Sequence, residues 1–291
     1  MVDAVTTPDG RTLAVREAGD PAGVPVLFHN GTPGSSLMYE PHVRDAEAKG
    51  IRLLSYDRPG YGGSTRNPGR NVADCAADVE AVCDALGIGR FCVWGISGGG
   101  PHALACAALL PDRCVAAAAL APVAPYDAEG LDFFAGMGEQ NVEEFGVIFE
   151  GEERHREVLE RDRAELLATT PDGLVAAWKT LLGPADVEVA NGRLAAYILE
   201  CMRVGIEDGL DGWLDDDVAF TRPWGFALES IRVPVQHWQG AQDRFVPFGH
   251  GEWLSRHIPG VESHLSDDDG HLTLAEHRVP EVHGWLLERY G

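Results

Sequence analysis

The stretch Phe91-Cys92-Val93-Trp94-Gly95-Ile96-Ser97-Gly98-Gly99 decides the fold of this chain. Its first four residues favour a strand, and residues 101–110 predict an almost unbroken apolar helix. The five residues between Trp94 and the helix match the G-x-S-x-G pattern, which holds a nucleophilic serine on a strained strand-to-helix turn. A side chain at either outer glycine would block the close approach of helix and strand. The pattern therefore predicts that Ser97 is a functional nucleophile.

Length, composition and charge predict an ordinary soluble protein. The chain has 291 residues, 45% hydrophobic and 24% charged, which suits one large domain or one domain with an insertion. A formal net charge of -23 repels phosphate backbones and anionic bilayers, so it disfavours nucleic acid and membrane surfaces as partners. The sequence contains no stretch of about 18 apolar residues, which is the length needed to span a membrane. The expected partner is a small-molecule substrate, and nothing in the sequence indicates a homo-oligomer.

The cysteines and the start of the chain predict a cytoplasmic protein. The first four residues show neither the basic leader nor the apolar stretch of a signal peptide. The six cysteines lie in apolar patterns without C-x-x-C spacing, so we expect reduced core residues. They are Cys75, Cys83, Cys92, Cys106, Cys114 and Cys201.

Strand and helix patterns alternate at both ends of the chain. Strands are predicted over 11–17, 24–29, 51–56, 91–94, 115–121, 233–238 and 261–265, and helices over 37–49, 72–86, 101–110, 247–257 and 272–289. Asn71 is expected to cap the second helix, and Gly87 to end it. This alternation predicts a parallel sheet covered by helices on both sides.

The middle of the chain has a different character. Residues 125–226 show no clear buried strand but several amphipathic helical stretches. The charged segment 152–157 and the acidic run 215–217 are expected to be solvated. One helix is predicted to place five apolar residues on a single face, namely Leu174, Val175, Trp178, Leu181 and Leu182. We predict a core domain of residues 1–124 and 227–291, with a helical cap inserted at 125–226.

A nucleophilic serine needs a nearby base, itself oriented by an acid. In a parallel sheet, functional groups gather at the carboxyl ends of the strands. Asp243 follows the strand at 233–238, and His271 follows the strand at 261–265. The order Ser97, Asp243, His271 is the chain order of this type of serine turn. Asp127, which follows an earlier strand, is the alternative acid.

At these residues the chain resembles the α/β-hydrolase family, and the resemblance covers essentially its whole length. It implies an α/β-hydrolase sandwich, a mostly parallel twisted sheet flanked by helices, with an inserted helical cap. The motifs that carry it are Gly95 to Gly99, Gly240-x-x-Asp243-x-x-Val246-Pro247, Gly270-His271, and residues 57–64 and 31–34.

The resemblance also implies roles for the site residues. Ser97 attacks a carbonyl carbon, His271 takes and returns the proton, and Asp243 orients and stabilises the imidazole. The developing oxyanion needs two backbone N–H groups, and the resemblance assigns them to Gly98 and Thr32. Family members usually carry His-Gly-x-Pro in the second loop. Here the histidine, at 29, stands one position earlier than usual, so its role and that of residue 30 stay open.

The remaining histidines and acidic runs favour structural roles. His29 is expected to brace a loop, His102 to lie in the helix beside the serine turn, and His237 to be a core residue. The acidic run 267–269 suggests a metal site, but no second cluster of ligands accompanies it. We therefore expect these carboxylates to be solvated. The glycine-rich segment 60–63 does not match a dinucleotide-binding fingerprint, because it lacks the full G-x-G-x-x-G pattern and the acidic residue that follows it. We therefore predict neither a metal nor a cofactor.

The serine itself narrows the chemistry. Haloalkane dehalogenases and epoxide hydrolases of the resembled family use an aspartate where this chain has Ser97. We therefore predict a serine hydrolase that forms an acyl-enzyme on a small to medium ester-like substrate. Thioesterases, carbon-carbon bond hydrolases, cofactor-free perhydrolases of the haloperoxidase-like type and a receptor-like ligand-binding member remain alternatives. A proline-releasing aminopeptidase is disfavoured, since Thr32 and Ile96 replace its usual loop glycine and tryptophan.

Overall fold

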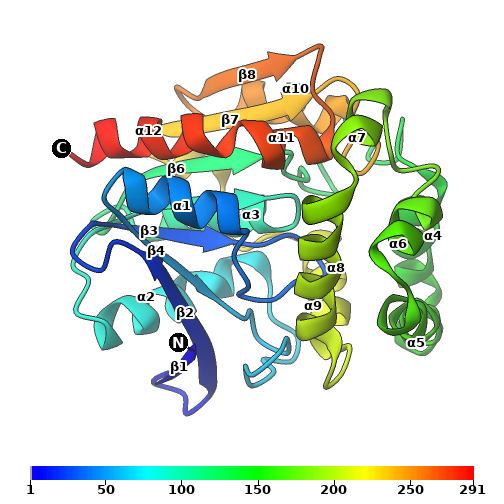
Figure 1. Cartoon of the computed structure of the whole chain (residues 1–291), viewed down its shortest axis with the longest axis horizontal. Helices are drawn as coiled ribbons and strands as arrows, with labels where there is room; N and C mark the ends of the chain where they lie inside the picture. Colours follow the sequence, from blue (N-terminus) through cyan, green and yellow to red (C-terminus); the bar gives the residue numbers. More distant parts are fainter. Residues whose placement is uncertain (1) are drawn as a thin grey trace.

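An eight-stranded sheet forms the centre of the protein, whose computed structural model describes residues 2–291 (Figure 1). The strand order is β1-β2-β4-β3-β5-β6-β7-β8. The β1–β2 and β2–β4 pairs are antiparallel and all other pairs are parallel, which confirms the predicted mostly parallel sheet. The strands are β1 (Val2–Thr6), β2 (Thr12–Gly19), β3 (Val24–His29), β4 (Ile51–Tyr56), β5 (Phe91–Ile96), β6 (Cys114–Leu120), β7 (Val235–Gly240) and β8 (Glu262–Ser266).

Helices cover both faces of this sheet (Figure 1). One face packs against α2 (Cys75–Ala85), α3 (Gly99–Leu109) and α10 (Phe248–His257), and the other against α1 (Glu40–Ala48), α11 (His271–His277) and α12 (Val279–Tyr290). A short 3-10 helix, η1 (Val72–Asp74), precedes α2 and is capped by the Asn71 side chain as predicted. Because helices bury both faces, the central strands are continuously apolar rather than alternating.

The structure differs from the prediction at both ends of the chain. The antiparallel edge strand β1 was not predicted. The single last helix predicted over 272–289 is wrong, because α11 ends at His277 and α12 begins at Val279. Pro280 lies in the first turn of α12. A proline there lacks the N–H that a continuous helix would need, whereas the first turn of a new helix tolerates it.

Helices fill the region between β6 and β7, and residues 121–234 contain no strand. The α-helices are α4 (Glu139–Val147), α5 (Glu152–Ala168), α6 (Pro171–Ala177), α7 (Pro184–Val189), α8 (Gly192–Ile206) and α9 (Asp211–Phe220), with 3-10 helices η2 (Ile148–Glu150) and η3 (Leu228–Ser230). Figure 1 shows α4 to α9 together at one end of the sheet, beyond the carboxyl ends of the parallel strands. The boundaries of the cap domain at 125 and 226 stay a prediction.

The predicted five-residue apolar face within this region is wrong. Helix α6 ends at Ala177, and Pro184 begins α7 only a few residues later. Leu181 and Leu182 are buried, but they lie in the turn between the two helices. Apolar spacing alone did not distinguish a continuous helix from a helix followed by a packed turn.

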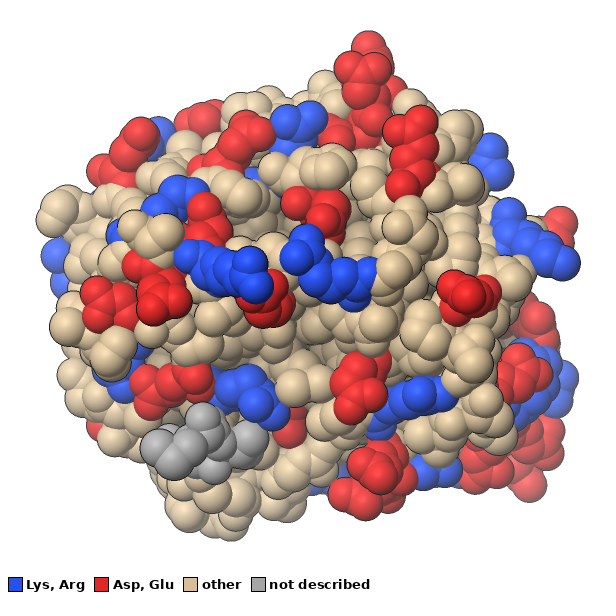
Figure 2. All heavy atoms as spheres, viewed as in Figure 1, with Lys and Arg blue, Asp and Glu red and all other residues tan. Residues whose placement is uncertain are grey.

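The surface agrees with the acidic composition. In Figure 2, acidic and basic side chains are interspersed over most of the visible face, and acidic ones gather at the lower right, where Figure 1 places α5. Glu152, Glu153 and Glu157 of α5 are exposed as predicted, but His155 in the same segment is buried. All six cysteines are free and buried. Within residues 2–291, no helix combines the length and apolarity needed to cross a bilayer.

Candidate functional site

The predicted strained turn lies between β5 and α3. Ser97 has a φ of 54°, in the left-handed region that a residue with a side chain rarely adopts. A Cβ atom at Gly95 would lie 2.2 Å from the carbonyl oxygen of Gly99, and one at Gly99 would lie 2.1 Å from that of His29. Glycine is therefore required on both sides, and the turn presents Ser97 at the carboxyl end of the central strand.

His271 and Asp243 are brought together at the same edge of the sheet. Nδ1 of His271 lies 2.8 Å from Oδ2 of Asp243, and both side chains are buried. The backbone N–H groups of Phe245 and Val246 donate to the other carboxylate oxygen, at 2.8 and 2.9 Å, so the acid is held in place. Asp127, the alternative acid, is exposed and makes no contact of this kind.

The electrostatics of His271 favour an imidazole that accepts a proton readily. Burial alone would lower the pKa of His271, but the charge and hydrogen bond of Asp243 raise it above its ordinary value, and Asp186 raises it further. Ser97 and His271 line one small cavity of about 120 Å³, together with apolar side chains such as Leu194 and Ile198. The serine, the imidazole and an apolar recess therefore share one space.

The loop of residues 31–34 lies directly beside Ser97. A Cβ atom at Gly31 would be 3.4 Å from the Cβ of Ser97, and one at Gly98 would be 2.3 Å from Oγ1 of Thr32. Within residues 2–291, neither the backbone N–H of Thr32 nor that of Gly98 donates to a protein acceptor. Two unused donors next to a serine can stabilise an oxyanion.

The two residues that precede this loop have structural contacts. His29 ends β3, is buried, and lies 3.8 Å from the Cys106 sulfur, while burial lowers its pKa well below the ordinary value. The side-chain amide of Asn30 donates to the carbonyl oxygens of Ser35 and Leu37, each at 3.0 Å. His29 is thus a buried structural residue, and Asn30 holds the loop while also lining the small cavity.

A buried ion network fixes Thr32 from the other side. The Thr32 hydroxyl donates to Oδ2 of Asp216 at 2.7 Å, and Asp216 is fully buried in α9. Its carboxylate pairs with Arg58 and with Arg70, each at 2.6 Å. Burial alone would raise the pKa of Asp216, but these two guanidinium groups hold it well below its usual range. The predicted solvation of 215–217 is therefore wrong.

The helix that begins with His271 is capped by another distant carboxylate. Asp186 of α7 accepts hydrogen bonds from the backbone N–H groups of His271 (3.0 Å), Leu272 (2.7 Å) and Thr273 (3.2 Å). These are orphan donors of the first turn of α11, where negative charge is also favoured. A Cβ atom at Gly270 would lie 2.5 Å from this carboxyl group, so only glycine fits before His271. This role of Asp186 was not predicted from the sequence.

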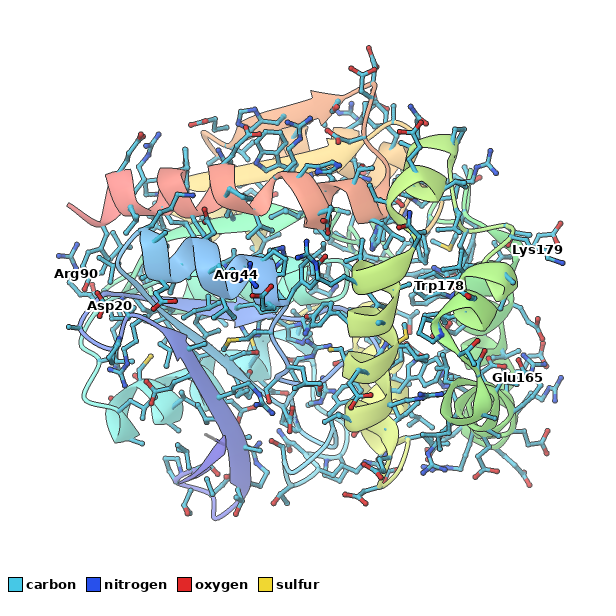
Figure 3. The ribbon with its side chains drawn as sticks, in the orientation of Figure 1. Asp20, Arg44, Arg90, Glu165, Trp178 and Lys179 are labelled. Carbon is cyan, nitrogen blue, oxygen red and sulfur yellow. The ribbon has the colours of Figure 1, made fainter. Side chains whose placement is uncertain are left out.

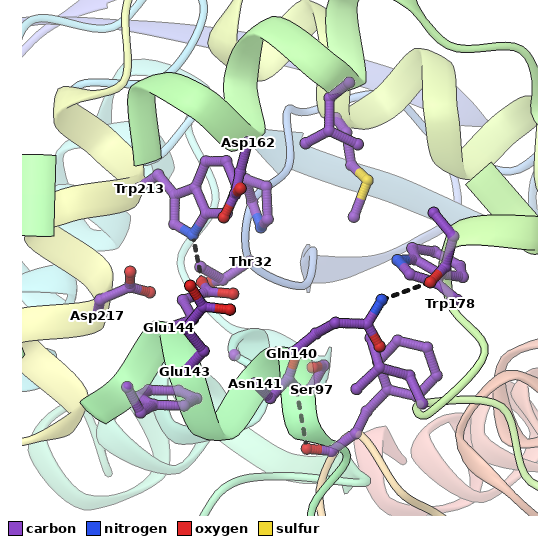
Figure 4. Close-up of a pocket in the computed structure, with 18 of the residues that line it drawn as sticks. Thr32, Ser97, Gln140, Asn141, Glu143, Glu144, Asp162, Trp178, Trp213 and Asp217 are labelled. Carbon is purple, nitrogen blue, oxygen red and sulfur yellow. Dashed lines mark hydrogen bonds between the residues drawn. The ribbon is translucent and has the colours of Figure 1, made fainter. Parts of the chain in front are cut away.

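A second, larger cavity of about 770 Å³ also opens onto Ser97 and is lined by Thr32, Gly98 and residues of α4, α5, α6 and α9. Figure 4 shows Asp217, Glu143 and Glu144 on one side, Trp178 on the other, and Ser97 and Thr32 between them. Figure 3 shows Trp178 and Glu165 among the helices beyond the sheet, whereas Lys179 points outward. Ser97 thus stands where the small apolar cavity and the larger one meet.

The acidic side of the larger cavity contains the buried carboxyl group of Asp217 and the half-buried one of Glu144. The indole N–H of Trp213 donates to Glu144 at 2.6 Å, and Oδ2 of Asp217 lies 2.9 Å from Nε2 of His155. Burial raises the pKa of Glu144 well above its ordinary value, and the nearby Asp217 adds to this. Burial likewise raises the pKa of Asp217, and ionised Asp216 raises it further. Both groups were missed from the sequence.

The other histidines and acidic runs take structural positions. His102 lies in α3 with Nδ1 2.9 Å from the carbonyl oxygen of Gly98, and His237 is a buried core residue of β7. In the run 267–269 the first two residues are exposed, but Asp269 is buried and pairs with Arg278 at 2.9 Å. Within the described part of the chain, no three His, Cys, Asp or Glu side chains gather as metal ligands do.

The fold and this geometry define an α/β protein with a strained serine at the carboxyl edge of a parallel sheet. The family model for the alpha/beta hydrolase fold matches residues 24–278. The chain therefore belongs to the alpha/beta hydrolase fold family, and it is a hydrolase enzyme.

Known relatives and a solved structure resemble the chain over most of its length. A bifunctional esterase/perhydrolase of Acinetobacter calcoaceticus is 28% identical, over 84% of this chain and 83% of that protein. Epoxide hydrolase A of Mycobacterium tuberculosis is 26% identical, over 96% of this chain and 94% of that protein. The structure of an alpha/beta hydrolase fold protein from Nakamurella multipartita has a TM-score of 0.72 and 26% identity, covering 100% of both chains.

Proposed function

We propose that the protein is a serine hydrolase that cleaves a small to medium ester through an acyl-enzyme. One observation carries the proposal: Ser97, held at a φ of 54°, shares a cavity with His271, whose Nδ1 lies 2.8 Å from Asp243. A serine at this turn suits attack on a carbonyl carbon, whereas epoxide hydrolases of the family carry an aspartate there. The named esterase activity of one relative supports the same reading.

In the proposed reaction, Ser97 Oγ attacks the ester carbonyl and its proton passes to Nε2 of His271. The N–H groups of Thr32 and Gly98 stabilise the oxyanion, and Asp243 stabilises the imidazolium. The bond to the alcohol oxygen then breaks, and His271 returns the proton to that oxygen. Water, activated by the same imidazole, cleaves the acyl-enzyme and releases the acid.

Ser97→Ala tests this proposal. The variant should lose turnover of short-chain p-nitrophenyl esters and labelling by a fluorophosphonate probe, because the acyl group has no oxygen to bond to. The matched control is Ser255→Ala, whose hydroxyl donates to a backbone carbonyl in α10, away from the site. An unlabelled wild-type protein, or a Ser97→Ala variant that still turns over and labels, would refute the acyl-enzyme.

A second candidate function is supported by the esterase/perhydrolase relative. In a perhydrolase, hydrogen peroxide replaces water in the second step, so the acyl-enzyme yields a peracid instead of an acid. Bromination of monochlorodimedone in the presence of acetate, bromide and peroxide would detect this peracid. Bromination that depends on Ser97 favours the candidate, and bromination that persists in Ser97→Ala contradicts it.

A further inference from the structure

Acidic side chains outnumber basic ones around the larger cavity. Arg161 is its only basic lining residue within the described chain, against Glu143, Glu144, Asp162, Glu165 and Asp217. Arg161 already pairs with Asp162 at 2.7 Å and with Glu143 at 3.1 Å. Its charge is therefore already paired with two other carboxylates of the cavity, and it forms no ion pair with Glu144 or Asp217.

Asp217 has no lysine or arginine partner among the described residues. Its side chain is 1% exposed and lines the cavity, and no N–H or hydroxyl group of those residues donates to Oδ1. Its neighbour is the carboxyl group of Glu144, which hydrogen-bonds with it when one of the two is protonated. Oδ2 lies 2.9 Å from Nε2 of His155, and burial lowers the pKa of that imidazole, so a positive charge is disfavoured there. Two carboxyl groups that share a site do not both ionise without a counter-charge, so in the free protein Glu144 and Asp217 share a proton, whereas a cation beside them would let both ionise.

Glu144 lies next to Asp217 and is partly exposed. Among the described residues, the indole N–H of Trp213 donates to it and the Asp217 carboxyl group hydrogen-bonds with it, but no lysine or arginine pairs with it. Figure 4 shows this carboxyl group and that of Asp217 on the same side of the cavity. Two neighbouring carboxyl groups without a cation form a site that an organic cation would satisfy.

We propose that Glu144 and Asp217 bind a protonated amine, so that the preferred substrate is an ester bearing an ammonium group on the portion that enters the larger cavity. This inference rests on the proposed function for the ester bond at Ser97. An ammonium group donates charge-assisted hydrogen bonds to both carboxylates, and the aromatic ring of Trp213 lies beside them. The smaller apolar cavity then holds the uncharged portion of the ester.

Asp216 shows what such a cation would do. Arg58 and Arg70 lower the pKa of that carboxyl group despite its burial. A substrate ammonium would supply to Glu144 and Asp217 the positive charge that the protein supplies to Asp216. The pKa of both groups, raised in the free protein, would then fall and both would ionise on binding.

Matched ester pairs test the proposal. Butanoates of dimethylamino alcohols with two to five methylene groups are compared with isosteres in which an isopropyl group replaces the dimethylammonium. For the best chain length, wild type should show at least about tenfold higher kcat/KM for the charged ester, since hydrogen bonds to charged groups are the strong ones. Glu144→Gln and Asp217→Asn should each reduce that ratio towards one. Asp215→Asn removes a charge that pairs with Arg66 instead, and should keep the ratio.

Binding to the inactive protein separates this inference from the proposed function. Ser97→Ala is titrated calorimetrically with n-pentylammonium and with 1-pentanol. The ammonium should bind at least about tenfold more tightly, and adding Glu144→Gln should abolish the difference. Equal binding of both probes, or equal turnover of charged and neutral esters, overturns the inference. If no ester is hydrolysed but the ammonium preference persists, the proposed function fails and the cation site stands.

Discussion

Asp216 and Asp217 are neighbours in α9, and both are buried, but their surroundings are opposite. Asp216 faces the loop that follows β4, where Arg58 and Arg70 pair with it at 2.6 Å each. Asp217 faces the larger cavity, where its neighbour is the carboxyl group of Glu144 and no lysine or arginine of the described residues pairs with it. The first carboxylate holds Thr32 in place, and we propose that the second binds substrate.

This contrast shows how one helix serves two purposes. A buried carboxylate that is paired stabilises the loop next to Ser97, because removing it would leave two buried guanidinium groups without a negative charge beside them. A buried carboxyl group that is unpaired reduces stability at neutral pH, since it must bind a proton or remain as an uncompensated charge. Binding sites often retain such unfavourable groups because a ligand completes them.

Asp216→Ala should have the largest effect on stability. It leaves Arg58 and Arg70 buried without their carboxylate, so the free energy of unfolding should fall by about 3–5 kcal/mol. Urea denaturation followed by tryptophan fluorescence measures the change. Asp215→Ala, which breaks a partly exposed pair with Arg66, is the control and should cost no more than about 1 kcal/mol. Equal losses of unfolding free energy in Asp216→Ala and Asp215→Ala would contradict a special stabilising role of the buried Asp216 network.

Asp186→Asn should have a smaller effect, visible in the pH profile. As general base His271 must be neutral, so kcat/KM should fall as the pH drops below its raised pKa. The negative charge of Asp186 contributes to that raised pKa, and the variant should therefore move the acid limb of the profile to lower pH. Loss of the charged cap should also lower the unfolding free energy by about 1 kcal/mol.

The control for this variant is Asp172→Asn, an exposed residue in the first turn of α6. Its profile should match that of wild type. An unchanged acid limb in Asp186→Asn would mean that the carboxylate only stabilises the helix and does not act on His271.

Asp217→Asn should have the smallest effect on the free energy of unfolding, and it should increase stability where the other variants decrease it. Because the pKa of Asp217 is raised in the folded protein, the folded state binds more protons than the unfolded state above pH 3.8. Wild-type stability therefore falls with rising pH in this window, while the asparagine variant lacks this loss. Relative to wild type, the variant should gain up to about 1 kcal/mol between pH 4 and pH 8, measured by urea denaturation. If the unfolding free energy of the variant minus that of wild type stays constant or decreases as the pH rises, the raised pKa of Asp217 is contradicted.

Much of the fold could be predicted from local patterns. The strands at 24–29 and 51–56 occur where predicted, since a short apolar run bounded by glycines and turns leaves few alternatives. The strained turn at Ser97 follows from two glycines whose positions leave no room for a Cβ atom. Helix boundaries in the region between β6 and β7 were less predictable, because a packed turn and a helix can share one apolar spacing.

The buried charges could not be predicted. The acidic run 215–217 suggests solvated carboxylates, because its partners are distant in the sequence. Those of Asp215 and Asp216 lie in the loop after β4, and Asp217 contacts His155 of α5. One signal was present: the run is flanked by Trp213 and Phe220, both buried. The burial of His155 was not predicted either, because the residues around it in the sequence are charged. Burial of a charge depends on partners distant in the chain, which periodicity does not reveal.

The sequence by itself determined the serine turn, the alternation of strands and helices, and the order of Ser97, Asp243 and His271. These features depend on backbone conformation and on apolar periodicity, which neighbouring residues specify. Only the tertiary structure decided that Asp186 caps the helix of His271, that Asp216 is paired, and that Asp217 faces a cavity without a cation. Those outcomes follow from which charges meet when distant segments pack together, since the energy of a buried carboxylate depends on its partners in space.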